Sequence, residues 1–162
     1  MNTHEQLNLI ISKVRDLQTA VFHNFSDGVL NIPSCIVHTI YVDDTGCIWF
    51  TVYKPMQYIS EFDRRFPVAL DYYQKGRPFS LNISGIARMV IDPEEINSLP
   101  PQVCNQAAPD KVLICVKITT ANYHAFKMDS PKSPLSQLKN YLASMFSPNH
   151  WHIDLQNQAY MA

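Results

Sequence analysis

The chain has 162 residues, of which 46% are hydrophobic, and its formal net charge at pH 7 is −1. A chain of this length buries about 70% of the surface that it exposes when unfolded, so we expect a single domain. Its 13 basic residues form no run, and a nearly neutral chain has no long-range field that would collect nucleic acid. No apolar stretch approaches the ~20 residues that span a bilayer, and the N-terminus lacks a signal-peptide core, so we expect no membrane partner and a cytoplasmic location.

The chain begins with apolar residues at helical spacing. They form one stripe, which consists of Leu7, Ile10, Ile11, Val14, Leu17 and Val21. This spacing predicts an N-terminal helix over residues 4–24, lying against the rest of the domain or forming an assembly face.

Two segments rich in β-branched and aromatic residues follow, at 34–42 and 47–53, with an Asp-Asp-Thr-Gly turn between them. This pattern predicts a β-hairpin. Residues 56–66 then carry apolar side chains at helical spacing, with Pro55 before them and Pro67 after them, which predicts a short amphipathic helix.

Strand character returns at residues 68–73 and 79–91. The second segment alternates apolar and polar residues throughout, which indicates a long half-buried strand. Gly85 lies in its middle, where a bulge or a sharp bend is tolerated best, and long bent strands close small barrels.

The rest of the chain is predicted to supply packing and closure. Asp92 and Pro93 resemble an N-cap and first helical residue, residues 100–110 are expected to form a loop, and residues 112–119 alternate as one more strand. A last helix is expected over residues 134–146, and the tail from 147 has no clear pattern.

The four cysteines contain no close pair, so we expect free, mostly buried thiols rather than a redox motif. His150 and His152 have a spacing that would suit a metal, but no third ligand lies nearby in the sequence, and we predict no metal site. Neither a Ser-His-Asp pattern nor a glycine-rich phosphate loop is present.

The order of these elements resembles the pyridoxamine 5′-phosphate oxidase-like split-barrel family, and especially its general stress protein branch. The likeness covers most of residues 28–119, and its best pieces are residues 48–54 (IWFTVYK) and 85–95 (GIARMVIDPEE). The resemblance implies a mainly β fold with flanking helices (α+β) built on a six-stranded split β-barrel. It also implies a homodimer with one flavin mononucleotide (FMN) in each of two clefts at the dimer interface.

Thr51 and Lys54 stand where the resemblance places the flavin phosphate, at the junction between a strand and the predicted helix. A hydroxyl, an ammonium and the free amides of a helix N-terminus suit a phosphate. The plainer interpretation is an ordinary strand threonine and a solvated lysine, and the sequence alone does not choose between the two.

The chain departs from the family at the first hairpin strand, where flavin-binding members carry an arginine and this chain reads Asn-Ile-Pro-Ser-Cys at residues 31–35. Losing one charge-assisted contact costs about 1.5–3 kcal/mol, or roughly one to two decades in affinity. His38 is a candidate replacement, although a strand histidine is more often simply hydrogen-bonded. The cofactor-binding residues predicted from the resemblance are His38, Thr39, Thr51, Val52, Lys54, Arg88 and Trp151.

The resulting hypothesis is an FMN-binding oxidoreductase that acts on an unknown small substrate, with no catalytic residue identified. One alternative is a non-catalytic binding or stress-associated module with a weakened or lost flavin site. Another is a split barrel that uses haem or a deazaflavin with a histidine ligand. Any named reaction would rest on analogy of fold.

Overall fold

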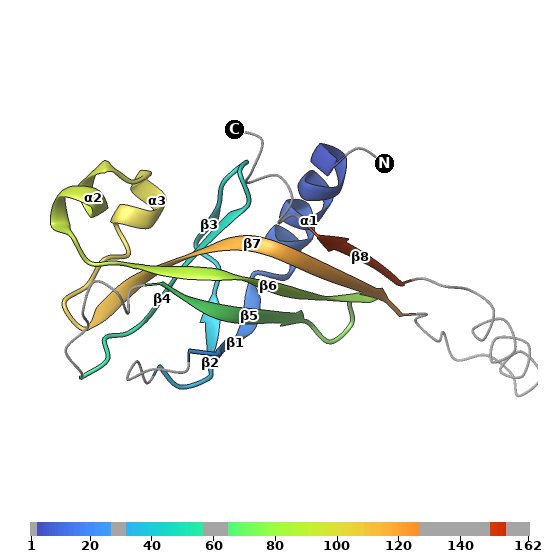
Figure 1. Cartoon of the computed structure of the whole chain (residues 1–162), viewed down its shortest axis with the longest axis horizontal. Helices are drawn as coiled ribbons and strands as arrows, with labels where there is room; N and C mark the ends of the chain where they lie inside the picture. Colours follow the sequence, from blue (N-terminus) through green and yellow to red (C-terminus); the bar gives the residue numbers. More distant parts are fainter. Residues whose placement is uncertain (1–2, 27–31, 57–64, 127–149, 155–162) are drawn as a thin grey trace, which may run out of the picture.

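The structure is a computed structural model that describes residues 3–26, 32–56, 65–126 and 150–154 (Figure 1). These residues form one antiparallel sheet of eight strands, flanked by three helices. The strands are β1 (Thr19–Asn24), β2 (Cys35–His38), β3 (Tyr41–Val42), β4 (Cys47–Tyr53), β5 (Arg65–Tyr73), β6 (Phe79–Val90), β7 (Lys111–Ala125) and β8 (His150–Asp154). The helices are α1 (Thr3–Leu17), α2 (Pro93–Ser98) and α3 (Pro101–Cys104).

The sheet curls into a split barrel. Its strand order is β2-β1-β5-β6-β7-β4-β3, so β2 and β3 lie at opposite ends of the path although only two residues separate them in the chain. At that crossing the Thr39 amide donates to the Gln18 carbonyl (2.7 Å), and the Ile40 amide donates to the Trp49 carbonyl (2.8 Å). The chain therefore steps from one sheet edge to the other and closes the barrel.

The strands β6 and β7 are the longest pairing in the molecule and run its whole length in Figure 1. The first part of β7 pairs with β4, and its later part pairs with β8. As a result α2 and α3 lie at one end of this pair and β8 lies toward the other.

A bulge bends this long pair at Gly85. Ser84 lies opposite Thr120 and Gly85 lies opposite Ile118, so Thr119 is left without a counterpart on β6. The Thr119 hydroxyl instead donates to the Ser84 carbonyl (3.0 Å). A Cβ atom at Gly85 would come within 2.4 Å of the Lys117 carbonyl oxygen, so only glycine fits there. The predicted long strand with a bend at Gly85 is confirmed.

The main core fills the barrel interior. One parity of β6 and one face of α1 point into it, and these residues are Phe79, Leu81, Ile83, Ala87, Met89, Ile10, Ile11, Val14 and Leu17. Burying each large apolar side chain contributes about 1.5–3 kcal/mol before the ordering entropy is subtracted.

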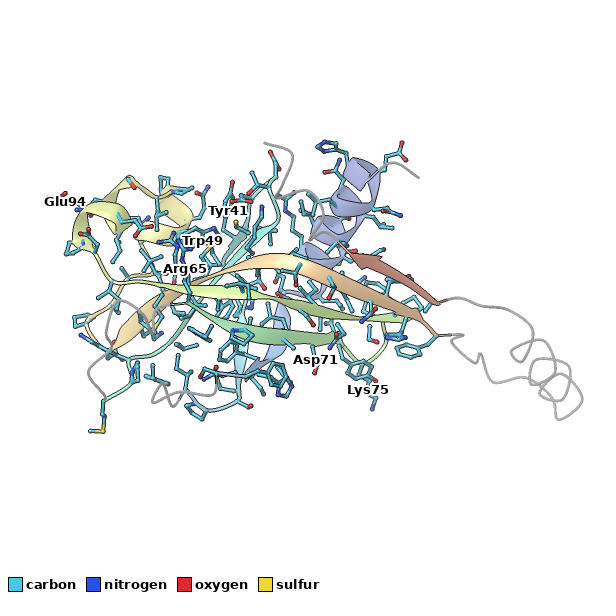
Figure 2. The ribbon with its side chains drawn as sticks, viewed as in Figure 1. Tyr41, Trp49, Arg65, Asp71, Lys75 and Glu94 are labelled. Carbon is cyan, nitrogen blue, oxygen red and sulfur yellow. The ribbon has the colours of Figure 1, made fainter. Side chains whose placement is uncertain are left out.

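A second, smaller core lies on the outer face of the sheet. Trp49 of β4, Val90 of β6 and Leu113 of β7 pack there against Val103 of α3. Figure 2 shows Trp49 close to the α2–α3 segment, with Tyr41 beside it. The two short helices therefore cover the outer face at one end of the barrel, and they shape the site described below.

The predicted helix over residues 4–24 is wrong beyond Leu17. Gln18 adopts a left-handed conformation (φ 57°), and its amide bonds to the Val14 carbonyl, which ends α1 and starts β1. Ala20 and Phe22 are buried, whereas Val21 between them is 40% exposed. Val21 fits a helical spacing of four after Leu17, but it belongs to a strand with a period of two.

Other predicted boundaries also change. The predicted strand 34–42 is divided into β2 and β3, and residues 65 and 66 begin β5 instead of ending a helix, while residues 57–64 lie outside the described residues. The loop expected at 100–110 contains α3, and the strand expected at 112–119 extends to Ala125. The patternless tail contributes β8, the sheet has eight strands rather than six, and the helix expected at 134–146 lies outside the described residues.

In the described part of the chain, no helix has the length and apolar character needed to cross a membrane.

Candidate functional site

A cavity of about 190 Å³ lies at one end of the barrel, where β4 ends and β7 begins, and its lining draws on both cores. Two lysines line it, Lys54 just after β4 and Lys111 at the start of β7. The rest of the lining is apolar and consists of Val90, Ile91, Ile96, Ala107, Ala108, Pro109, Val112 and Leu113.

The pairing of β4 with β7 brings the two lysines to the same place. Tyr53 lies opposite Lys111, and Thr51 lies opposite Leu113. Just past the strand, the Lys54 amide donates to the Asp110 carbonyl (2.9 Å), which extends the pairing by one more bond. The sequence between the two lysines is long, so only this register makes them neighbours.

Alternation along β4 decides which side chains point into the barrel and which point to its outer face. Phe50 and Val52 are buried in the barrel core, so Thr51 and Tyr53 point to the outer face. Tyr53 is 77% exposed, and Thr51 is half-buried. Thr51 and Tyr53 therefore share the outer face of β4, whereas Lys54, just past the strand, is the residue of this segment that lines the cavity.

The wall formed by α2 is fixed by its N-cap. The Asp92 carboxylate accepts from the Glu94 amide (3.0 Å), and Pro93 occupies the first turn, as predicted. The Ile96 amide bonds to the Asp92 carbonyl (2.9 Å), and the Ile96 side chain lines the cavity. The loop before Lys111 is held by a bond from its amide to the Ala108 carbonyl (3.1 Å).

The chemistry of this lining favours an anion with an apolar part. Two ammonium groups meet an otherwise apolar wall, and lysine is a common phosphate ligand in proteins. Ligand pockets typically enclose about 300–1,000 Å³. At about 190 Å³ the cavity can enclose only part of a cofactor-sized ligand.

Arg88 is engaged elsewhere. Its guanidinium donates to the Glu95 carboxylate of α2 (2.5 Å), and it is not among the residues that line the cavity. This ion pair joins β6 to α2 and leaves Arg88 with a structural partner at the position where we predicted a phosphate contact.

Three other predicted residues also lie away from the cavity lining. His38 is exposed at the end of β2, opposite Thr19. Thr39 is buried at the barrel closure, where its hydroxyl bonds to the Tyr72 hydroxyl (2.7 Å), and burial raises the pKa of Tyr72. Val52 points into the barrel and is 5% exposed.

Trp151 lies in β8, opposite Tyr123, and its side chain is outside the described part of the structure. Of the predicted set, Lys54 lines the cavity and Thr51 does not, while Lys111 is a lining residue that was not predicted. Sequence reasoning missed Lys111 because its one signal, a cation at the start of a strand, is common. Among residues with described positions, no group of three His, Cys, Asp or Glu side chains could hold a metal ion.

No protein-family model matches the sequence, and no curated protein matches it either. Solved structures do match. A general stress FMN/FAD binding protein from Xanthomonas citri is 19% identical, with a TM-score of 0.56, over 82% of this chain and 96% of the other. A general stress family protein from Xanthomonas campestris pv. campestris is 18% identical, with a TM-score of 0.58, over 82% of this chain and 95% of the other.

A third match is a protein related to general stress protein 26 from Clostridium acetobutylicum, described as of the pyridoxinephosphate oxidase family. It is 14% identical, with a TM-score of 0.56, over 75% of this chain and 89% of the other. Identities this low establish the fold alone. The chain therefore has the split-barrel fold of general stress protein 26 and pyridoxamine phosphate oxidase-like structures, as the resemblance predicted.

Proposed function

We propose that this protein binds a flavin, with FMN as the preferred form. The observation that carries the proposal is that two lysines, Lys54 and Lys111, line one cavity at the end of the split barrel. The Xanthomonas citri protein, which shares the fold, is an FMN/FAD binding protein. Lys111 supplies a second positive charge to a site that lacks the family's arginine in the first hairpin strand.

Each residue around the cavity has a proposed task. Lys54 and Lys111 hold the phosphate, with Thr51, paired with the lining residue Leu113, as a nearby hydroxyl donor. Tyr53, exposed and directly opposite Lys111, offers an aromatic ring for the flavin ring system to stack on. When bound, FMN supplies the electron-transfer chemistry, and the chain binds and orients it.

The residues that line the cavity offer no general acid or base besides the two lysines. An oxidoreductase activity therefore rests on the flavin itself and on a small substrate that approaches it. The same observation favours a second candidate function, a flavin-binding module without catalysis. A cytosolic location is part of the proposal, because the four cysteines are free thiols.

The protein is proposed to act as a homodimer. Its cavity encloses too little volume for a whole flavin, so a second chain is a natural source of the missing wall. Exposed apolar side chains also lie on the outer face of β1, β2 and β6. Ile36 is 76% exposed and lies opposite Val21, and Ile86 is 43% exposed.

Binding of FMN and of riboflavin, measured by quenching of flavin fluorescence, tests the phosphate site. Lys54→Ala and Lys111→Ala should each weaken FMN binding about ten- to a hundredfold, the effect of one charge-assisted contact, and should leave riboflavin binding unchanged. Lys75→Ala is the matched control, because Lys75 is exposed and is not among the residues that line the cavity. Equal losses for both flavins would remove the phosphate assignment.

A further inference from the structure

Two cysteines face the same side of neighbouring strands. Cys47 begins β4 and Cys115 lies in β7, and the register places Cys47 opposite Lys117 and Trp49 opposite Cys115. The two cysteines are therefore diagonal neighbours on the outer face of the sheet, and their thiols hydrogen-bond to each other. The sequence gives no hint of this pair, because the cysteines are far apart along the chain.

The two thiols differ in access. Cys47 is half-buried, whereas Cys115 is 7% exposed and belongs to the second core. The Asp43 turn fixes Cys47, since the Asp43 carboxylate accepts from the Cys47 amide (2.9 Å). The Thr45 hydroxyl lies 3.6 Å from the Cys47 sulfur. A reagent in solution therefore meets Cys47 first, with Cys115 beside it on the neighbouring strand.

The surroundings also shift the pKa values of the two thiols in opposite directions. The hydrogen bond from the Cys115 thiol is the main factor that lowers the pKa of Cys47 to about 6, and the Thr45 hydroxyl and Lys117 act in the same direction. Burial and Asp43 oppose them. The hydrogen bond to Cys47 and burial raise the pKa of Cys115, with Arg88 opposing. These directions favour a thiolate at Cys47 and a neutral thiol at Cys115.

We propose that Cys47 is a peroxide-reactive cysteine and that Cys115 is its resolving partner, forming a reversible disulfide between β4 and β7. A thiolate is the nucleophile that hydroperoxides oxidise, and the nearby thiol is placed to capture the product. This inference does not rest on flavin binding.

The chemistry proceeds in two steps. The Cys47 thiolate attacks one oxygen of the hydroperoxide, the O–O bond breaks, and the leaving oxygen takes a proton to become water or an alcohol. Cys47 is then a sulfenic acid. The Cys115 sulfur attacks the Cys47 sulfur, the S–S bond forms, the S–O bond breaks, and the hydroxide leaves as water with the thiol proton. In total two thiols lose two electrons and one hydroperoxide gains them.

The register also explains why the bond should be reversible. Diagonal neighbours across an antiparallel pair are about 7–8 Å apart between Cα atoms, and an unstrained disulfide prefers about 5.5–6 Å. A bridge between Cys47 and Cys115 must therefore draw β4 and β7 together locally. Strained disulfides are the more readily reduced ones.

Trp49 reports on the bridge, because it lies directly opposite Cys115 and is buried in the same small core. The chain has two tryptophans, so a Trp151→Phe background leaves Trp49 as the one indole. Formation of the disulfide should quench its fluorescence, and dithiothreitol should restore it.

The test treats the full chain with hydrogen peroxide and maps the products by mass spectrometry. The expected product is a peptide pair linked through Cys47 and Cys115, which dithiothreitol releases. Cys115→Ser should instead accumulate a sulfenic acid at Cys47 that dimedone traps, and Cys47→Ser should leave Cys115 unmodified. Cys35→Ser and Cys104→Ser are the matched controls and should behave as the parent chain does.

Preferential oxidation of Cys35 or Cys104 in the parent chain would overturn the proposal, and so would a Cys47 that takes up oxygen without linking to Cys115. These outcomes are read from the parent chain itself, so they hold even if Cys115→Ser folds poorly. Flavin content is measured on the same samples, which separates a failure here from a failure of the flavin site.

Discussion

At the scale of single residues, the environment of Cys47 sets it apart from the other thiols. Its main stabilising contact as a thiolate is the Cys115 thiol, with help from Thr45 and Lys117. For Cys35, burial raises the pKa, and among the described residues no neighbouring hydrogen bond or charge offsets this effect. Two half-buried cysteines of one protein therefore differ in charge at neutral pH.

The alkylation of Cys47 by iodoacetamide should rise with pH through a midpoint of about 6, because the lowered pKa makes the thiolate the main form above that value. The midpoint for Cys35 should lie higher than that of an ordinary cysteine, because burial raises its pKa. Peptide mapping after short pulses at each pH gives both curves. Parallel curves for the two cysteines would contradict the assigned environment of Cys47.

Substitutions of Tyr53 and Lys54 should distinguish binding of the flavin ring from binding of the phosphate. Tyr53→Ala should weaken FMN and riboflavin by the same factor, about three- to tenfold for a stacking contact of roughly 0.5–1.5 kcal/mol, because both flavins share the ring system. Lys54→Ala should affect FMN alone. Titrations of both variants with both flavins check this, and a phosphate-dependent effect of Tyr53→Ala would argue against ring stacking there.

At the scale of elements, the bulge between β6 and β7 determines how the sheet bends. Gly85 has no room for a side chain, since a Cβ would meet the Lys117 carbonyl at 2.4 Å. Gly76 makes a useful contrast, because it has open space around it but a φ of 89°. One glycine is required by packing and the other by backbone conformation.

Gly85→Ala should lower the free energy of unfolding by about 3 kcal/mol or more, because the backbone of β7 must move. Gly76→Ala should cost only about 1–2 kcal/mol, the strain of a left-handed residue. Urea denaturation followed by circular dichroism measures both. Equal losses would mean that the close approach at Gly85 is not what constrains the bulge.

The end of α1 carries strain that a substitution can relieve. Gln18 holds a left-handed conformation that costs a non-glycine residue about 1–2 kcal/mol. Gln18→Gly should therefore stabilise the protein by about 0.5–1 kcal/mol, after the greater freedom of glycine in the unfolded chain is subtracted. An unchanged or lower urea midpoint would show that the Gln18 side chain makes a stabilising contact of its own.

The sequence predicts well those elements whose pattern is long or whose signals are local. The strand 79–91 and its bend at Gly85, and the N-cap at Asp92, are confirmed. The helix predicted at residues 19–24 is wrong because Val21 fits both a helical and an alternating pattern. Lys111 beside Lys54, and Cys115 beside Cys47, depend on the register of β4 with β7, which no local pattern specifies.

At the scale of the whole molecule, the split barrel leaves a cavity too small for a flavin and several apolar side chains of the sheet exposed to solvent. Both features suit an assembly of two chains. If Ile36 and Val21 form the interface, Ile36→Asp should convert a dimer into a monomer, which light scattering would report as a halved mass. Gln102→Asp, on the exposed surface of α3, is the control and should leave the mass unchanged. A monomeric parent chain would contradict the dimer.

If this barrel binds FMN through its phosphate at the cavity of Lys54 and Lys111, the purified protein should keep the flavin. The most direct measurement is the visible absorbance spectrum of the purified protein after incubation with FMN and removal of the excess, alongside the Lys54→Ala Lys111→Ala double variant. The proposed site predicts a flavin spectrum that the parent chain retains and the double variant loses. A colourless parent chain that cannot be loaded would contradict it.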